Sequence, residues 1–231
     1  MLQLERQQDL MRLLQAKKSM TVKELCGALF ASPATVRRDL AALEQAGLLT
    51  RSFGGAVLNE TFPDQQPLAV RSGEHVAEKK RLAARAAALV RPGQTVFLDA
   101  SSTTCYLVPH LQGIQDLTVI TNNPRACLSL AELGVRCLCT GGEMLEGSMV
   151  LAGSSAERFV RGVRAHLFFF SARGVAEGEI TDSSKAERDL KIAMLEQAEQ
   201  GILLYDASKE GKRYPYIITA RDRVTVISEG G

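Results

Sequence analysis

The sequence predicts an α/β protein with two domains: an N-terminal winged helix-turn-helix and a larger C-terminal domain built on a parallel β-sheet. Two patterns carry this prediction. Three helical patterns and a Gly-Gly turn occupy residues 1–58, and short apolar runs alternate with helical stretches from residue 94 onward. The segment 59–75 between them has two prolines and little hydrophobic periodicity, so we expect a linker there and the larger domain at 76–231.

The bulk composition is that of an ordinary folded protein. The chain has 231 residues, of which 45% are apolar and 23% charged, which argues against a disordered chain. No run approaches the roughly 20 apolar residues of a membrane helix, and the charged start MLQLERQQDL is unlike a secretory signal. We therefore expect a cytoplasmic protein without contact with a membrane.

The five cysteines form no CxxC pair, which argues against a zinc site or a disulfide framework. We expect neither a metal nor a cofactor. Free cysteine behaves as a small apolar side chain, so reduced core thiols are expected at Cys26, Cys105, Cys127, Cys137 and Cys139.

Three helices are predicted before residue 48. Leucines at helical spacing indicate a first helix of about four turns. Thr21 and Glu24 have the spacing of a capping box at the start of a short second helix. Ser32 caps a third helix, with Pro33 at its first position, and Gly47 ends it. Two short apolar runs around Gly-Gly then predict a β-hairpin wing.

The third predicted helix has one apolar side and one polar side. Val36, Leu40 and Leu43 recur at helical spacing and should face the core. A recognition helix presents its outer residues to the major groove, where arginine binds guanine or phosphate with two hydrogen bonds. The expected DNA-binding residues on this helix, its neighbours and the wing are Thr21, Lys23, Ser32, Ala34, Thr35, Arg37, Arg38, Arg51, Gly54 and Gly55.

A second interpretation of Arg37 and Arg38 is that they only solvate the helix and pair with Asp39 or Glu44. Charge alone does not decide the matter, because residues 1–58 hold eight Lys/Arg and five Asp/Glu, a mild excess of +3. The surrounding capped helices and the Gly-Gly wing favour DNA binding.

Residues 21–58, TVKELCGALFASPATVRRDLAALEQAGLLTRSFGGAVL, carry three motifs together: the S-P-x-T-x-R-R-D-L core, the L-x-x-x-G ending and the R-x-x-G-G-A wing. This stretch resembles the N-terminal domain of the DeoR family of bacterial regulators of sugar metabolism. The resemblance implies a sequence-specific DNA-binding regulator.

The larger domain is predicted to contain five buried parallel strands. The apolar runs are TVFLDA, LTVITN, VRCLCT, AHLFFFSA and GILLYDA. Ligands collect at the carboxyl ends of such strands, and each run is followed by hydroxyl, amide, glycine or charged residues. The candidate ligand-binding residues at these ends are Asp99, Ser101, Ser102, Thr103, Thr104, Thr121, Asn122, Gly141, Gly142, Ser171, Arg173, Gly174, Asp206 and Lys209.

The chemistry of these residues favours an anionic ligand with hydroxyl groups. Arg173 and Lys209 are the candidate cations, and the hydroxyls of 101–104 suit a phosphate or a polyol. The alternative is that these hydroxyls only cap a helix. No P-loop lysine is present, so a nucleoside triphosphate is not expected.

This half resembles the DeoR-family effector domain, itself similar to phosphosugar isomerases such as ribose-5-phosphate isomerase. The resemblance implies sugar-phosphate contacts at 99–104 and 206–209 and a T-N turn at 121–122. It also assigns Glu187 and Lys191 to the family's E-x-x-x-K pattern. Because these two lie at i and i+4 on a helix, they are equally consistent with a surface ion pair.

The sequence departs from the family pattern in three places. Ser101 stands where the family commonly has glycine, and Ser171–Gly174 contains an arginine where the family often has an acid. The chain also stops at VISEGG, short of a final helix and strand found in many relatives. We expect a more anionic ligand and a different sheet edge as a result.

The expected function is a transcriptional regulator, most simply a repressor of a carbohydrate operon, that binds operator DNA under the control of a sugar phosphate. One helix-turn-helix meets few bases, so a homodimer or homotetramer is expected. Two alternatives remain open: a sugar-phosphate isomerase or deaminase with a DNA-binding attachment, and a constitutive DNA-binding protein with an empty pocket. The isomerase alternative lacks paired carboxylates and a catalytic histidine motif in the sequence.

Overall fold

The computed structural model describes residues 3–45, 49–52, 54–58, 71–145 and 148–229. The expected helix end at Gly47 and most of the expected linker, 59–70, lie outside these residues. The chain divides into two compact units, Met1–Gly73 and Glu74–Leu145 with Met149–Gly231. No helix among the described residues is long and apolar enough to cross a membrane.

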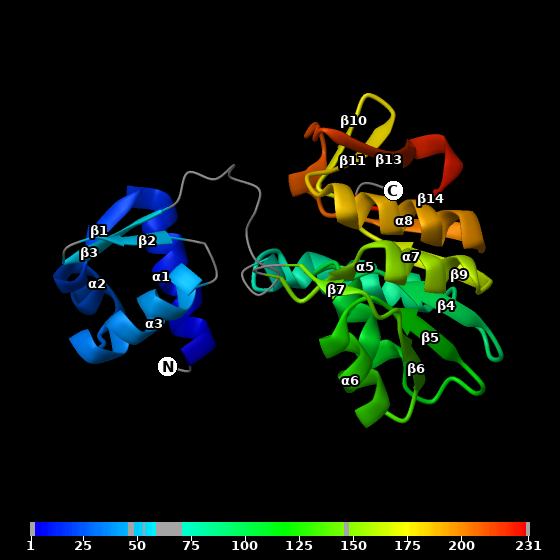
Figure 1. Ribbon diagram of the computed structural model, residues 1–231, viewed down its shortest axis with the longest axis horizontal. Helices are drawn as coiled ribbons and strands as arrows, with labels where there is room; N and C mark the ends of the chain where they lie inside the picture. Colours follow the sequence, from blue (N-terminus) through cyan, green and yellow to red (C-terminus); the bar gives the residue numbers. More distant parts are fainter. Residues whose placement is uncertain (1–2, 46–48, 53, 59–70, 146–147, 230–231) are drawn as a thin grey trace. The chain divides into compact units, whose positions relative to one another are not determined.

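The N-terminal unit packs three helices against a small antiparallel sheet (Figure 1). Its elements are α1 Gln3–Lys17, β1 Ser19–Thr21, α2 Val22–Leu29, α3 Pro33–Gln45, β2 Leu49–Ser52 and β3 Gly55–Leu58. The strand order is β1-β3-β2. Sequence analysis predicted the β2–β3 hairpin and missed β1, because a three-residue strand is too short to show alternation.

The predicted caps and core of this unit are confirmed. Thr21 and Glu24 form the capping box of α2, and the Ser32 hydroxyl accepts a hydrogen bond from the Thr35 N–H at the start of α3. The inward side of α3 is buried as expected, in a cluster that includes Leu10, Leu14, Leu25, Leu29, Val36, Leu40, Leu43 and Leu49.

The second unit is organised around a six-stranded parallel sheet. The strands are β4 Thr95–Leu98, β5 Thr118–Thr121, β6 Arg136–Cys139, β9 Ala165–Phe170, β12 Ala198–Leu204 and β14 Thr225–Ile227. Their order is β14-β12-β9-β4-β5-β6, with every neighbouring pair parallel. The five predicted strands are present and parallel, but β6 at the sheet edge is not buried as expected, and β14 is an additional strand at the other edge.

Helices cover both faces of this sheet (Figure 1). Alternate strand residues face α5 Val76–Ala87, the 3₁₀ helix η1 Thr104–Leu111 and α6 Pro124–Glu132 on one side. The other face packs against α7 Ser154–Arg161 and α8 Lys185–Gln197. Burial on both faces explains why the strands read as continuous apolar runs in the sequence.

Short antiparallel pieces extend from the carboxyl ends of the strands. The pair β7 Glu143–Met144 and β8 Leu151–Ala152 follows β6, and a three-stranded sheet has the order β10-β11-β13. Its strands are β10 Gly174–Ala176, β11 Glu179–Asp182 and β13 Tyr216–Ala220. Two further 3₁₀ turns are η2 Ala207–Lys209 and η3 Arg221–Arg223.

The strand order contains a topological switch point. The chain adds β5 and β6 on one side of β4, and then adds β9, β12 and β14 on the other. Loops leaving β4 and β9 therefore diverge to opposite sides of the sheet, which is where open α/β sheets bind their ligands.

The cysteines correct one expectation. All five are free thiols, but each is only partly buried, so they are not fully enclosed core residues. Cys137 and Cys139 lie on β6, an edge strand of the sheet, where part of their surface stays exposed. Burial raises the pKa of both thiols, so they are poor nucleophiles at neutral pH.

Candidate functional site

The helix-turn-helix places a basic surface on the outer side of α3. Ala34, Arg37 and Arg38 are exposed, whereas Thr35 is partly buried and shares a 2.9 Å hydrogen bond with the Ser32 hydroxyl. Lys23 is exposed on α2. These residues have the exposure that a recognition helix requires.

Arg37 and Arg38 do not pair with the acidic residues that the second interpretation offered. Asp39 is buried and forms a 2.5 Å ion pair with Arg6 of α1. Glu44 is bound by Arg51, also at 2.5 Å. Within the described residues neither Arg37 nor Arg38 forms an ion pair, so both guanidinium groups are available for an external anion.

Arg51 and the two wing glycines have local structural contacts. Arg51 donates to Glu44 from both its backbone N–H and its side chain, and these hydrogen bonds lower the pKa of Glu44. Gly54 has φ +85°, and a Cβ at Gly55 would lie 2.6 Å from the Met20 carbonyl oxygen. These glycines shape the wing, and the Arg51 side chain is held at Glu44 through its Nε.

At the switch point, Asp99 joins the loop after β4 to the loop after β9. Its Oδ1 accepts from the Ser101 N–H and from the Thr104 hydroxyl at 2.8 Å, while its Oδ2 accepts from the Ser171 N–H. The Ser101 hydroxyl is also hydrogen-bonded to Thr104. Asp99, Ser101 and Thr104 therefore fix the loop rather than offer free groups.

Ser102 and Thr103 are the remaining hydroxyl residues of this loop. Both side chains are buried, and neither has a hydrogen-bond partner among the described residues. The following helix is a 3₁₀ helix without a side-chain cap, so the alternative that these hydroxyls cap a helix fails for Thr103. The two hydroxyls remain available to a ligand at the switch point.

A buried ion-pair network lies beside Asp99. Lys191 of α8 contacts Asp182 at 2.6 Å and Asp99 at 3.5 Å, and all three side chains are at most 8% exposed. The surface-pair interpretation is therefore wrong for Lys191. Sequence analysis missed the role of Asp182, because its partner is nine residues away on another element, and only the fold brings the two together.

The pKa shifts of this network follow from burial and charge. Burial alone would lower the pKa of Lys191, but the negative charges of Asp182, Asp99 and Glu187 outweigh it, and the pKa is raised. Burial likewise opposes ionisation of Asp182, but Lys191 and Arg173 outweigh it and lower the pKa. Lys191 and Asp182 are therefore both charged at neutral pH.

The remaining candidate residues between β9 and β12 in the chain are Arg173, Gly174 and Glu187. Arg173 is partly buried, its N–H donates to Thr181, and its positive charge acts on Asp182. A Cβ at Gly174 would lie 2.2 Å from the Lys212 carbonyl oxygen, so glycine is needed there for packing. Glu187 is partly buried in the first turn of α8.

The loop after β5 contains an unsatisfied buried acceptor. Thr121 accepts from the Asn123 N–H, and the Asn122 amide donates to the Leu151 carbonyl. Within the residues that the structure describes, Asn122 Oδ1 has no hydrogen-bond partner. Gly141 and Gly142 are exposed after β6, where a Cβ at Gly142 would lie 2.5 Å from the Ala152 carbonyl oxygen. Gly142 is thus required by packing and Gly141 by its left-handed backbone (φ +67°), whereas Asn122 offers an oxygen to a hydrogen-bond donor.

Asp206 and Lys209 follow β12 as predicted. Asp206 is 1% exposed and caps η2 through Oδ1, whereas its Oδ2 has no hydrogen-bond partner among the described residues. Burial would raise the pKa of Asp206, but hydrogen bonds from Ser208 and the charges of Lys209, Lys79 and His75 outweigh it and lower the pKa. Lys209 is partly buried beside this carboxylate.

Among solved structures, the likeness to one eIF2B subunit supports the α/β architecture. The δ subunit of eIF2B from Chaetomium thermophilum aligns with a TM-score of 0.51 at 14% identity, over 67% of this chain and 56% of that one. Ribose 5-phosphate isomerase A from Methanocaldococcus jannaschii aligns with a TM-score of 0.43 at 17% identity, over 58% and 54%. Likeness at these identities concerns the fold alone.

Sequence comparison covers nearly the whole chain. A helix-turn-helix regulator of Bacillus subtilis, YulB, is 35% identical over 100% of this chain and 90% of its own length. The regulator GolR of Listeria innocua is 33% identical over 96% and 89%, and the putative aga operon repressor of Escherichia coli O157:H7 is 29% identical over 98% and 86%. These relatives are named as transcriptional regulators and not as enzymes.

Family models give the same result for each unit. The DeoR-like helix-turn-helix domain matches residues 6–62, and the DeoR C-terminal sensor domain matches residues 74–229. The motifs, the winged fold and both matches agree, and the chain belongs to the DeoR family of DNA-binding transcriptional regulators.

Proposed function

We propose that this chain represses a carbohydrate-utilisation operon in the cytoplasm, and that a phosphorylated sugar bound at the β4–β9 switch point controls its affinity for operator DNA. The observation that supports the ligand most strongly is a set of side-chain oxygens at the carboxyl ends of the strands that form no hydrogen bond within the described residues, of which Asn122 Oδ1 is fully buried. Buried polar groups are normally hydrogen-bonded, and unpaired ones at a ligand-binding edge point to a missing polar partner.

These unpartnered atoms suit a sugar. Asn122 Oδ1 is an acceptor that lacks a donor, and a sugar hydroxyl is a donor. The hydroxyls of Ser102 and Thr103 both donate and accept, so they match the same kind of ligand. Arg173 and Lys209 supply positive charge for a phosphate group, which each binds through charge-assisted hydrogen bonds.

The DNA side of the proposal rests on α3. Its exposed arginines enter the major groove, and a second copy of the chain doubles the contact on a paired half-site, as a homodimer or homotetramer. The putative aga operon repressor and the L-fucose operon activator of Escherichia coli are among the relatives, so sugar operons are the first targets to test. Because one of these names is a repressor and the other an activator, the direction of control needs its own measurement.

The ligand is tested with a thermal-shift series of phosphorylated and unphosphorylated sugars on the full chain. We expect one sugar phosphate to raise the melting temperature, because a ligand that binds only the folded state stabilises it. The shift should fall in the Lys209→Ala and Ser102→Ala variants and persist in Lys80→Ala, which removes an exposed lysine of α5.

Three results decide this proposal. Retention of the full shift in both Lys209→Ala and Ser102→Ala would place the ligand elsewhere. Equal shifts with the unphosphorylated sugar would remove the phosphate from the proposal. Absence of any shift across the series would reject sugar phosphates as the ligand class.

A further inference from the structure

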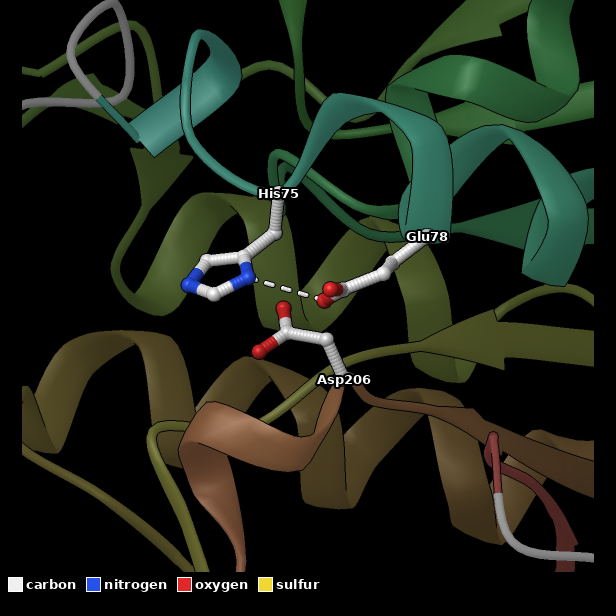
Figure 2. Close-up of side chains that lie close together, drawn as sticks. All are labelled: His75, Glu78 and Asp206. Carbon is white, nitrogen blue, oxygen red and sulfur yellow. Dashed lines mark hydrogen bonds and ion pairs between the residues drawn. The ribbon is translucent and has the colours of Figure 1, made fainter.

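Three side chains outside the switch point converge in the C-terminal unit (Figure 2). His75 directly precedes α5, Glu78 lies in the first turn of that helix, and Asp206 follows β12. The imidazole Nδ1 is 2.8 Å from a Glu78 carboxylate oxygen, and one donor atom from each residue lies within 4.8 Å of the other two. Figure 2 shows the Asp206 carboxylate directed towards the other two side chains.

The second observation is the state of the Asp206 carboxylate. The side chain is 1% exposed, and its Oδ2 has no hydrogen-bond partner in the part of the chain that the structure describes. An unsatisfied buried acceptor of this kind costs about 1–3 kcal/mol, and the cost is larger for a charged group. An imidazole and a second carboxylate beside it do not satisfy that oxygen, but a cation between the three groups would.

We propose that His75, Glu78 and Asp206 bind a divalent transition-metal ion of the Zn²⁺ or Mn²⁺ type. Imidazole nitrogen is a preferred ligand of Zn²⁺, and carboxylate oxygen is a ligand of both ions. Three protein ligands leave at least one coordination position for water or for an oxygen of a small molecule.

The geometry permits closure around an ion. Metal–ligand bonds of about 2.0–2.2 Å place tetrahedral ligand atoms roughly 3.3 Å apart, so the widest separation must shorten by about 1.5 Å. His75 and Glu78 have side chains that are 42% and 29% exposed and are held by the hydrogen bond between them, whereas Asp206 is held by its cap to Ser208. The fixed carboxylate therefore defines the position, and the two outer ligands adjust.

The charges around the site set its strength. Two carboxylates balance the charge of a divalent ion, but Lys79 and Lys209 lie close enough to act on Asp206 and oppose a further cation. A metal ion competes with protons for its ligands, so its binding should weaken as the pH falls. The sequence did not predict this site, because its ligands come from two segments that are far apart in the chain and do not have the spacing typical of metal ligands.

The test uses the full chain without sugar, after removal of metals with a chelator. Equilibrium dialysis with Zn²⁺ and with Mn²⁺ should give one bound ion per chain. His75→Gln and Glu78→Gln should each weaken binding at least about tenfold. His110→Gln is the matched control, since it removes an exposed histidine of η1 and should leave binding unchanged.

Asp206→Asn should weaken metal binding as strongly. Because Asp206 also caps η2, the test is decided by the variants of the two partly exposed ligands, His75→Gln and Glu78→Gln. Co²⁺ separates this site from the cysteines, because thiolate ligands give intense charge-transfer absorption and nitrogen or oxygen ligands do not. Wild-type affinity in His75→Gln and Glu78→Gln, a thiolate spectrum, or no bound ion in the wild type would each overturn the proposal. None of these readouts depends on the sugar phosphate.

Discussion

Arg37 and Arg38 on α3 are exposed and form no ion pair within the described residues, whereas Lys191 on α8 is buried between Asp182 and Asp99. All three occur in family motifs of the sequence. Their surroundings give them different tasks, because an exposed cation is free to meet a phosphate and a buried one must be neutralised where it stands. The comparison teaches that burial, and not the motif alone, decides which of these cations can reach an external anion.

The largest predicted effect is the loss of stability when the buried cation, Lys191, is removed. Lys191→Met leaves Asp182 and Asp99 without their cation, and breaking a buried pair in this way costs about 3–5 kcal/mol. Urea denaturation of the full chain, followed by circular dichroism, should show this loss. Lys185→Ala, which removes the exposed partner of Asp189, should cost less than about 0.5 kcal/mol. Equal losses in the two variants would contradict the assignment of Lys191.

The pH dependence of stability sharpens this prediction. The raised pKa of Lys191 means that its contribution is full below the ordinary value of 10.5 and is lost as the pH rises through the folded value. The lowered pKa of Asp182 means that its contribution is full above 3.8 and is lost as the pH falls through the folded value. The stability gap between wild type and Lys191→Met should stay flat from about pH 5 to 9 and narrow outside that window. A gap that changes across neutral pH would contradict the charge assignment.

Removing an exposed arginine of α3 should reduce DNA binding without reducing the stability of the fold. Arg37→Ala should weaken binding to the DNA beside the chain's own gene by about 1–3 kcal/mol if it contacts a base. If it contacts a phosphate, the slope of log affinity against log salt should fall by about one. Fluorescence anisotropy over a salt series measures both quantities. Arg125→Ala, an exposed arginine of α6 in the other unit, is the control.

Features formed by residues close together in the chain were predictable from the sequence, whereas contacts between distant residues were not. The capping box at Thr21, the inward side of α3 and the five parallel runs were predictable because each depends on residues near one another in the chain. The Lys191–Asp182–Asp99 network was not, since its three members lie on different elements. Likewise, no local pattern shows that Gly174 is required by the Lys212 carbonyl or that Glu44 binds Arg51.

The smallest predicted effect concerns the turn that leads into α3. Phe30 is 97% exposed and adopts a left-handed conformation with φ +49° at the end of α2. Glycine has no Cβ to strain in this conformation, so Phe30→Gly should stabilise α2 by about 1 kcal/mol. Hydrogen exchange of the α2 amides in the full chain measures the gain. Phe30→Ala keeps the Cβ and should give little gain, so an equal gain in both variants would contradict this explanation.

Coupling between the exposed arginines and the buried edge of the sheet is measured most directly by DNA anisotropy with and without the sugar phosphate found by thermal shift. We expect the ligand to change DNA affinity at least about fivefold in the wild type. The change should disappear in Lys209→Ala, while that variant binds DNA normally without ligand. A ligand that stabilises the protein yet leaves DNA affinity unchanged would contradict control of α3 from the sheet edge.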